Sequence, residues 1–392
     1  MTANTVQKQS VLVVYGTRPE VIKLAPVVRQ LQCSQEFHPV ICATAQHREL
    51  LDQMTRVFDL TPDYDLNVMT ERQTLFSITT RVLEGVGKVI ETVKPAYVLV
   101  QGDTTTTFAS SLAAFYHNVP VGHVEAGLRT FDVQNPYPEE MNRRLTSQIA
   151  SIHFAPTQSA RANLLREGVR DENILVTGNT VVDAIEWMIA RLDESRNGDL
   201  RRYGLNGHDC WPVLITAHRR ENWGDGLEQI CMAIRNLVAW NDKVCILFPV
   251  HPNPVVSDLV KKHLNNLPRV HLIPALSYPD FVYLMSRCRV VITDSGGVQE
   301  EVASLGKPVV ITREKTERPE IVSCGLGILT GTDPLRITKA VKQMLEKPPV
   351  QAVSPFGDGR AAKRIVEHLR RSSLTPSSGT KVRAIAGTLS PQ

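Results

Sequence analysis

Short apolar runs alternate with longer stretches of helical periodicity along most of the 392-residue chain. The apolar residues in each run are continuous, which is typical of a strand that is buried on both faces of a parallel sheet. The stretches between them place apolar residues three and four positions apart, as amphipathic helices do. We therefore expect repeated strand–helix–strand units. Strands are predicted at 11–16, 38–44, 97–103, 120–126, 151–157 and 173–179.

The same pattern begins again after a polar stretch that bears glycine. TVVDAIEWMIARLDE predicts a helix, and the following RNGDLRRYGLNGHD is typical of a domain boundary. A second series of strands is predicted at 212–218, 243–251, 269–275, 289–295 and 307–313.

Two domains also agree with a chain longer than one hydrophobic core usually organises. We expect two doubly wound α/β domains. The first covers 10–195 and is joined by a closing helix at 361–372, and the second covers 205–355. The Ser-, Thr-, Gly- and Pro-rich segment 373–392 predicts a disordered tail.

Charge and cysteine content narrow the class of protein. The 44 basic and 40 acidic residues give a net charge of +4, too small to predict nucleic acid or a membrane surface as a partner. The polar start and the short first apolar run predict neither a signal peptide nor a membrane helix. The seven cysteines are scattered and none forms a CxxC pair, so we expect neither a disulfide framework nor a zinc site. These features predict a cytoplasmic protein in a reducing environment.

Polar side chains follow the predicted strands at their carboxyl ends, where doubly wound sheets bind ligands. Glu125 is notable among them because it lies inside an apolar run, and carboxylates are rarely buried without a partner. The other candidates at strand ends are Arg18, Lys23, Asp103, His218, Arg219, His251 and the run Asp294-Ser295-Gly296-Gly297.

The run TDSGG predicts an anion site at the start of a helix. Ser295 can cap that helix, and the two glycines after it let backbone N–H groups approach a ligand. One turn later, Glu300 or Glu301 could accept hydrogen bonds from a ribose diol. A purely structural interpretation stays open, in which the acidic residues only favour the helix dipole. Arg18 and Lys23 could likewise be solvated helix charges, and His218 a core histidine.

Several common motifs do not occur in the sequence. No GxGxxG follows the first strand and no GxxxxGK[ST] is present, which argues against a dinucleotide-dependent dehydrogenase and a P-loop enzyme. HExxH, GxSxG and EF-hand spacings do not occur either. The remaining pattern predicts a crevice that holds a nucleotide diphosphate and moves protons beside it.

From about residue 10 to 370 the chain resembles the non-hydrolysing UDP-N-acetylglucosamine 2-epimerases. The resemblance rests on GTRPEVIKLAPV, TAQHREL, QGDTTTTFASSLAAFY, VGHVEAGLRT, YPEEMNRR, TGNTVVDA, TAHRREN, PVHPNP, TDSGGVQEE and TERPE, in that order. It implies two Rossmann-like domains of the glycosyltransferase B type and a homodimer. It also implies interconversion of UDP-GlcNAc and UDP-ManNAc without added NAD or metal. The implied route eliminates UDP from C1 of the sugar as the C2 proton is removed, and then adds UDP back to 2-acetamidoglucal.

The resemblance also assigns site residues. Asp103 and Glu139 are the acid and base candidates, and Glu125 is expected to tune or position them. The full catalytic set is Asp103, Glu125, Glu139 and His218. The set that matches UDP-binding positions is Arg18, Lys23, Ser295, Gly296, Gly297, Glu301 and Arg318, with Phe281 near the uracil.

Some members of that family bind a second UDP-GlcNAc as an activator. The matching positions here are Gln46, Arg72, Glu139, Arg219 and His251. Glu49 stands where the activated members have a glutamine, so the added negative charge puts activation in question.

Three other functions stay open. A hydrolysing epimerase would release ManNAc and UDP, and would differ only in how water reaches the intermediate. A glycosyltransferase of the same fold would use a UDP-sugar donor and would need an acceptor groove. An inactive sensor of nucleotide sugars is disfavoured by the intact carboxylates. The sequence does not distinguish cell-wall polymer, capsule or antibiotic-sugar biosynthesis.

Overall fold

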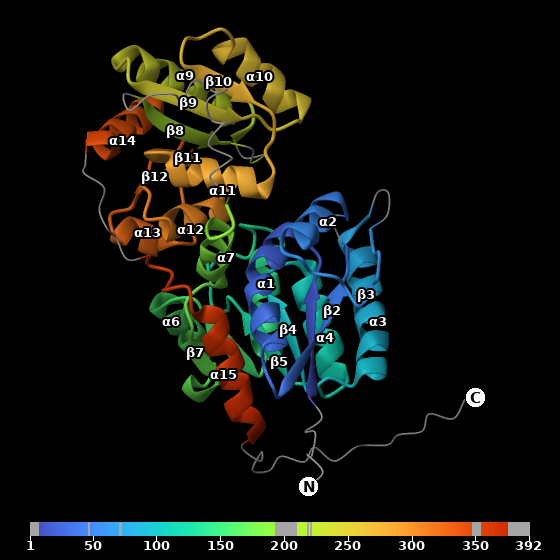
Figure 1. The fold of residues 1–392 in the computed structure, drawn as a ribbon. Helices are drawn as coiled ribbons and strands as arrows, with labels where there is room; N and C mark the ends of the chain where they lie inside the picture. The colour runs from blue at the N-terminus through green and yellow to red at the C-terminus, as the bar shows by residue number, and fades with distance from the viewer. Residues whose placement is uncertain are drawn as a thin grey trace.

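Two α/β domains, each built on one parallel sheet, make up the protein (Figure 1). The computed structural model describes residues 8–45, 48–69, 73–192, 210–217, 219, 222–346 and 354–374. The two sheets, with helices alternating between their strands, confirm the predicted fold class. The boundary predicted near 195–205 lies outside the described residues. So does the predicted disordered tail 373–392, except for its first two residues, which are helical.

The first sheet has the strand order β3-β2-β1-β4-β5-β6-β7, and its strands pair in parallel. Its strands are β1 (Gln9–Tyr15), β2 (Phe37–Ala43), β3 (Tyr64–Asp65), β4 (Tyr97–Gln101), β5 (Val121–Val124), β6 (Ile152–Ala155) and β7 (Ile174–Val176). The helices of this domain are α1 (Arg18–Gln32), α2 (Arg48–Val57), α3 (Leu75–Val93), α4 (Thr105–Tyr116), α5 (Glu139–Ile149), α6 (Gln158–Arg166), the 3₁₀ turn η1 (Asp171–Asn173) and α7 (Thr180–Ile189).

The second sheet has the order β10-β9-β8-β11-β12-β13 and is also parallel. Its strands are β8 (Trp211–Thr216), β9 (Val244–Pro249), β10 (Val270–Ile273), β11 (Val290–Thr293), β12 (Val309–Ile311) and β13 (Gly327–Leu329). The helices are α9 (Asp225–Trp240), α10 (Pro254–Leu264), α11 (Tyr278–Arg287), α12 (Gly296–Ser304), α13 (Pro319–Ser323) and α14 (Pro334–Glu346), and α15 (Ala361–Leu374) closes the described chain.

Residues along β1 alternate between two apolar cores, which explains why its sequence is continuously hydrophobic. Val11 and Val13 belong to the core that includes residues of α1, α7 and α15. Leu12 and Val14 belong to the core formed with α3 and α4 on the other face. Because each fully buried aliphatic side chain contributes roughly 1.5–3 kcal/mol, a strand covered on both faces favours an unbroken apolar run.

The last helix returns to the first domain. α15 packs against α1 and α7, and Figure 1 shows it, in red, beside the first sheet. Asp183 of α7 accepts hydrogen bonds from the backbone N–H groups of Ala361 and Ala362, at 3.2 and 3.0 Å. These contacts satisfy two donors at the start of α15 and tie the helix to α7.

The two domains meet along an apolar and polar interface. α7 packs against α11 and α12 of the second domain. The ring of Phe58 stacks on Trp187 with centroids 5.1 Å apart, and lies 5.9 Å from the ring of Tyr278. On the polar side, Thr157 donates a hydrogen bond of 2.6 Å to Glu320. Both kinds of contact join the domains beside the crevice between them.

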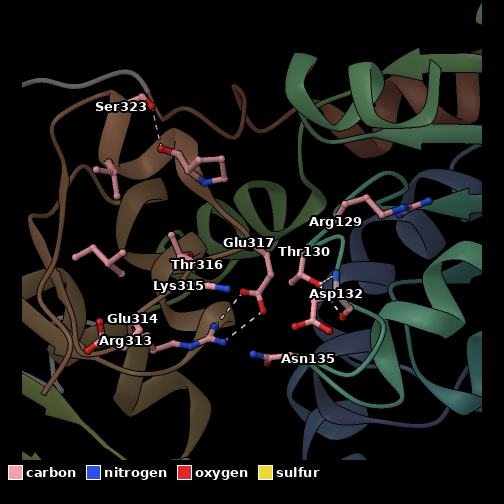
Figure 2. Close-up of a pocket in the computed structure, with 13 residues that line it drawn as sticks. Arg129, Thr130, Asp132, Asn135, Arg313, Glu314, Lys315, Thr316, Glu317 and Ser323 are labelled. Carbon is pink, nitrogen blue, oxygen red and sulfur yellow. Dashed lines mark hydrogen bonds and ion pairs between the residues drawn. The ribbon is translucent and has the colours of Figure 1, made fainter. Parts of the chain in front are cut away.

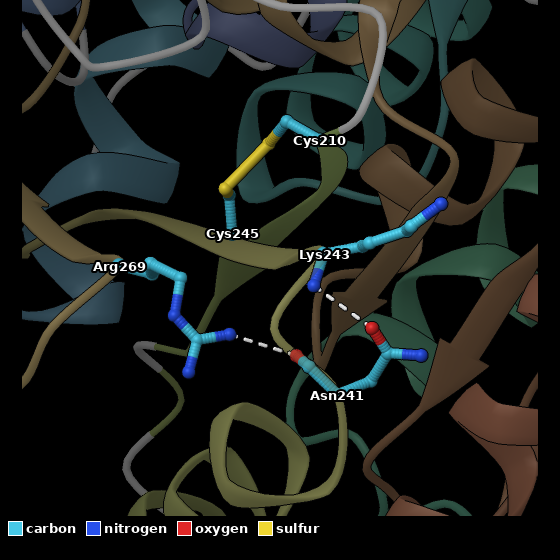
Figure 3. Close-up of a disulfide and its surroundings, with 5 residues drawn as sticks. All are labelled: Cys210, Asn241, Lys243, Cys245 and Arg269. Carbon is cyan, nitrogen blue, oxygen red and sulfur yellow. Dashed lines mark hydrogen bonds between the residues drawn. A yellow bond between two sulfur atoms is a disulfide. The ribbon is translucent and has the colours of Figure 1, made fainter.

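Cys210 and Cys245 form a disulfide, with their Cα atoms 6.2 Å apart (Figure 3). This pair differs from the expectation of unlinked cysteines, and a disulfide is uncommon in the reducing environment that the sequence predicts. Sheet register explains the pairing, because Pro212 lies opposite Cys245 and so places Cys210 beside β9. A separation of 35 residues does not reveal that register. The other five cysteines are free.

Among the residues that the structure describes, no helix is long and apolar enough to cross a membrane.

Candidate functional site

The strand order of each sheet reverses at one point, and the candidate residues gather there. In the first sheet the reversal lies between β1 and β4, and in the second between β8 and β11. Loops that leave two such strands in opposite directions open a crevice at the carboxyl ends. Lys23 of α1 and Glu300 of α12 lie 2.7 Å apart, so the two crevices face each other across the domain boundary.

Glu20 holds the loops at the first reversal together. Its carboxylate accepts hydrogen bonds from the N–H groups of Gly16 and Thr17, at 2.8 and 2.7 Å, and from the hydroxyl of Thr104 at 2.6 Å. The chain also approaches closely here, because a Cβ on Gly16 would lie 2.2 Å from the Thr44 hydroxyl. The loops that carry Arg18 and Asp103 are therefore fixed to one another.

Asp103 is held by α5. The guanidinium of Arg143 donates from Nε to Asp103 Oδ2 at 3.0 Å, and its second terminal nitrogen lies 2.7 Å from the same oxygen. Arg143 also donates to the buried carboxylate of Glu140 at 2.9 Å. The Asn142 amide donates to the Asp103 carbonyl at 3.0 Å. These contacts fix the carboxylate of Asp103 at the carboxyl edge of the first sheet.

Glu139 lies beside this group at the first residue of α5. Burial raises the pKa of its half-buried carboxyl, and the nearby Asp103 raises it further, while Arg143 and Arg219 act in the opposite direction. Its Oε2 atom is buried and has no hydrogen-bond partner in the described part of the chain. Glu139 is thus a carboxyl that retains a proton more readily than usual, and one of its oxygens has no hydrogen-bond partner among the described residues.

Glu125 is locked in place directly after β5. Its backbone adopts a left-handed conformation with φ of 64°, which is uncommon for a residue other than glycine. The carboxylate accepts hydrogen bonds from Lys23, from Gln101 and, at 2.9 Å, from Asn179. Backbone strain of this kind, on the order of 1–3 kcal/mol, persists only where the surroundings enforce it. The three donors also resolve why a carboxylate lies within an apolar run.

The start of α12 forms a cationic cradle. Ser295 caps the helix by accepting from the Val298 N–H at 3.5 Å, as the sequence predicts. The guanidinium of Arg318 packs against Gly296, where an added Cβ would lie 2.6 Å from its nitrogen. At Gly297 an added Cβ would meet nothing within 4 Å. Helix N–H groups, an arginine and open space together suit an anion.

Glu301 of α12 and Arg18 of α1 lie close enough to interact electrostatically. Burial raises the pKa of Glu301 to about 7, and the Arg18 guanidinium opposes that increase. Arg18 itself lies over the ring of Tyr278, 5.5 Å from its centroid. Phe281 is buried one turn further along α11.

The residues expected to bind an activator are only partly described. Gln46 and Arg72 lie outside the described residues, and so does His218 of the expected catalytic set. Arg219 is near enough to Glu139 to lower its pKa, and its N–H donates to Asp294 at 3.0 Å. His251 is exposed after β9 and accepts from the N–H of Asn253 at 3.2 Å.

Sequence reasoning missed several residues that shape the site. Gln101 and Asn179 lie at carboxyl ends of strands in the same way as Asp103, so the same rule could have found them. Arg143 is four residues after Glu139 and therefore lies on the same face of α5. The missed residues are Glu20, Gln101, Arg143, Asn179 and Glu317.

A cavity of about 460 Å³ opens beside the predicted site rather than at it. Figure 2 shows it between the loop 129–135 of the first domain and the segment 313–323 of the second. It is connected to the cationic cradle through Glu317, which lines the cavity and pairs with Arg318 at 3.1 Å. No group of three or more His, Cys, Asp or Glu side chains within the described ranges is placed to hold a metal ion.

Comparison with known proteins identifies the family. A family model described as UDP-N-acetylglucosamine 2-epimerase matches residues 29–370. The chain belongs to the UDP-N-acetylglucosamine 2-epimerase family. The UDP-N-acetylglucosamine 2-epimerase of Salmonella typhimurium is 48% identical, over 92% of this chain and 98% of its own length.

Solved structures of the epimerase family have the same fold. The UDP-GlcNAc 2-epimerase of Neisseria meningitidis, bound to UDP-GlcNAc, superposes with a TM-score of 0.86 and 44% identity, over 92% of this chain and all of that one. The S. aureus MnaA structure with UDP gives a TM-score of 0.85 and 40% identity, over 95% and 100%. The two parallel-sheet domains are thus of the glycosyltransferase B type that the resemblance implies.

Proposed function

We propose that the protein interconverts UDP-GlcNAc and UDP-ManNAc by a non-hydrolysing epimerisation at C2. The observation that carries this proposal is the placement of a cationic helix start and a pair of carboxylates, Asp103 and Glu139, on facing edges of one crevice. The names and ligands of the Salmonella, Neisseria and S. aureus relatives support UDP-GlcNAc as the substrate.

The second domain would hold the nucleotide. Backbone N–H groups at Gly296 and Gly297 face the diphosphate, and Arg18, Lys23 and Arg318 neutralise its charge. Glu301 accepts hydrogen bonds from the ribose hydroxyls, and Phe281 lies near the uracil. The sugar then extends towards the first domain, where the carboxylates are.

The chemistry is a redox-neutral elimination followed by an addition. A base removes the C2 proton, the C2–H electron pair forms a C1=C2 bond, and the C1–O bond breaks with its electrons leaving on UDP. UDP oxygen then attacks C1 of 2-acetamidoglucal while an acid delivers a proton to the opposite face of C2. Water is not consumed, and the diphosphate charge that develops is stabilised by the cations already aligned to it.

This reaction needs proton transfer on both faces of C2, and we assign one carboxylate to each face. Glu139, whose burial raises its pKa, is suited to hold the proton that is delivered. Asp103, fixed by Arg143, then accepts the C2 proton in the direction from UDP-GlcNAc to UDP-ManNAc. In the reverse direction the two exchange roles, as microscopic reversibility requires. Glu125 positions Lys23, and His218 is assigned a place near the diphosphate by resemblance alone.

A homodimer is also proposed, and an exposed apolar surface supports it. Phe115 and Tyr116 of α4 are 59% and 64% exposed, and Met141 and Leu145 of the neighbouring α5 are 40% and 39% exposed. Exposed large apolar side chains on two adjacent helices suit a contact with another protein. Sedimentation velocity should give a dimer for the native protein and a monomer for Met141→Asp.

One incubation tests the function against its rivals. The purified protein is mixed with UDP-GlcNAc alone, and the products are followed by proton and phosphorus NMR. We expect UDP-ManNAc to accumulate to an equilibrium mixture with little free UDP. Free ManNAc that appears in step with UDP would establish the hydrolysing reaction instead. Turnover only after an acceptor is supplied would establish a glycosyltransferase.

A further inference from the structure

Six buried charged side chains form one continuous chain through the domain interface. Each is at most 10% exposed at its side chain. The signs of their charges alternate along this series of ion pairs, so three carboxylates balance three cations. In order, the members are Glu125, Lys23, Glu300, Arg318, Glu317 and Arg313.

Glu300 is the link between the two domains in this chain. One of its oxygens lies 2.7 Å from Lys23 Nζ of the first domain, and the other accepts from Arg318 Nε at 2.6 Å. Burial alone would raise the pKa of Glu300, but the charges of Arg318 and Lys23 outweigh the effect of burial, so the pKa of Glu300 is lowered. Glu300 is therefore an ionised carboxylate between two cations.

Both of these cations have two carboxylate partners. Lys23 contacts Glu125 and Glu300, and Arg318 contacts Glu300 and Glu317. These are also the cations that the proposed function assigns to the diphosphate. A diphosphate that binds both of them must compete with Glu300, because Glu300 is the only one of the three carboxylates in this chain of charges that contacts both.

We propose that Glu300 is a positioning residue, an internal counter-ion that holds Lys23 and Arg318 together across the domain interface and yields them to the substrate's diphosphate. The inference rests on the proposed function, because it takes these two cations as diphosphate ligands. Glu300 then has opposite effects on two steps. It opposes nucleotide binding by competing for the cations, and it favours catalysis by keeping Lys23, and through it Glu125, in place.

Glu300→Gln separates these effects, since the amide keeps the volume and loses the charge. We expect UDP to bind about fivefold more tightly, and kcat to fall about tenfold. Replacing a residue that only supports the fold would instead lower both the UDP affinity and kcat. Glu317→Gln is the matched control, because Glu317 also contacts Arg318 but does not contact Lys23. It should also tighten UDP binding, and its kcat should fall less than that of Glu300→Gln.

The far end of the chain offers a second comparison. Figure 2 shows Arg313 paired with Glu317 where both line the cavity. Glu317 therefore lies next to a space that water can enter, whereas Glu300 is enclosed between the domains. This difference is a further reason to expect a smaller effect on catalysis from Glu317→Gln than from Glu300→Gln.

The experiment measures UDP binding by titration calorimetry and turnover of UDP-GlcNAc by NMR, after circular dichroism has shown that each variant is folded. Arg18→Ala is included as a gauge of the nucleotide site. Unchanged UDP binding in Arg18→Ala would contradict the proposed nucleotide site itself. Weakened binding in Arg18→Ala, together with Glu300→Gln that binds UDP no more tightly than the native protein, would overturn the counter-ion role alone.

A second variant keeps the test decisive if Glu300→Gln does not fold. Glu300→Asp retains the charge but is one methylene shorter, so it cannot span both cations. We expect its UDP affinity to stay within about twofold of the native value and its kcat to fall about tenfold. Full kcat in Glu300→Asp would show that the bridge between Lys23 and Arg318 does not position the site.

Discussion

Replacing Glu139 with glutamine tests the proposed chemistry at a carboxyl that makes few structural contacts. Its Oε2 has no hydrogen-bond partner among the residues described, so an amide of the same size breaks no hydrogen bond at that atom. The lost charge removes a favourable interaction with the start of α5, about 0.3–1 kcal/mol, and relieves the cost of burial. The free energy of unfolding should therefore change by less than about 1 kcal/mol.

Turnover should respond far more strongly than stability. A positioned acid or base contributes about 10²–10⁴-fold to a rate, so Glu139→Gln should lower kcat at least about 100-fold, which is about 2.7 kcal/mol. The UDP affinity should stay within about twofold, because Glu139 is assigned to the sugar and not to the nucleotide. Since the proton donor is active below its pKa, and burial raises the pKa of Glu139, native kcat should fall as pH rises past that value.

The assay follows UDP-GlcNAc conversion by NMR across pH, with UDP binding measured by calorimetry and unfolding by urea. Glu172→Gln is the matched control, because Glu172 is 68% exposed and pairs with Arg170 away from the crevice. It removes the same charge and should leave kcat unchanged. A folded Glu139→Gln variant with kcat within about threefold of the native protein would exclude Glu139 from proton transfer.

Three further changes extend the account. Burial raises the pKa of Glu301 to about 7, and the ionised form accepts the ribose hydroxyls, so UDP affinity should rise about tenfold between pH 6 and 8. Glu301→Gln should bind UDP weakly, with an affinity that does not change over this pH range. A native UDP affinity that is independent of pH would contradict this role. Asp183→Ala should lower the free energy of unfolding in urea by about 1 kcal/mol, because two N–H groups of α15 lose their acceptor; unchanged stability would show that the contact contributes nothing. If UDP-GlcNAc is an activator, pure UDP-ManNAc should turn over with a lag. Glu49→Gln should then strengthen activation by removing a negative charge. Full activity on UDP-ManNAc without a lag would exclude an activating UDP-GlcNAc site.

The strands could be predicted well because each is covered on both faces. Every strand expected from a continuous apolar run is present, although several end earlier than expected. The run 97–103, for example, stops at Gln101, because Gly102 and Asp103 already belong to the loop. The two strands that were missed, β3 and β13, are short edge strands of two and three residues, so they have no extended apolar run to reveal them.

The site could be predicted only as far as it depends on strand ends. Asp103, Glu125 and Ser295 follow parallel strands, and the carboxyl-end rule locates all of them. The ion chain through Glu300 depends on which helices cross the domain boundary, and the Cys210–Cys245 disulfide depends on the register of β8 against β9. Neither relation is encoded in local spacing, so the three-dimensional packing was needed to show them.

The most direct test of the central claim is isotope exchange at C2 of the sugar. The protein is incubated with UDP-GlcNAc in D₂O, and the C2 position of both UDP-sugars is followed by NMR until equilibrium. Elimination and re-addition predict deuterium at C2 of UDP-ManNAc from the first turnover, and at C2 of UDP-GlcNAc as the reaction reverses. UDP-ManNAc that forms while retaining its original C2 hydrogen would contradict the mechanism, whatever the arrangement of the carboxylates.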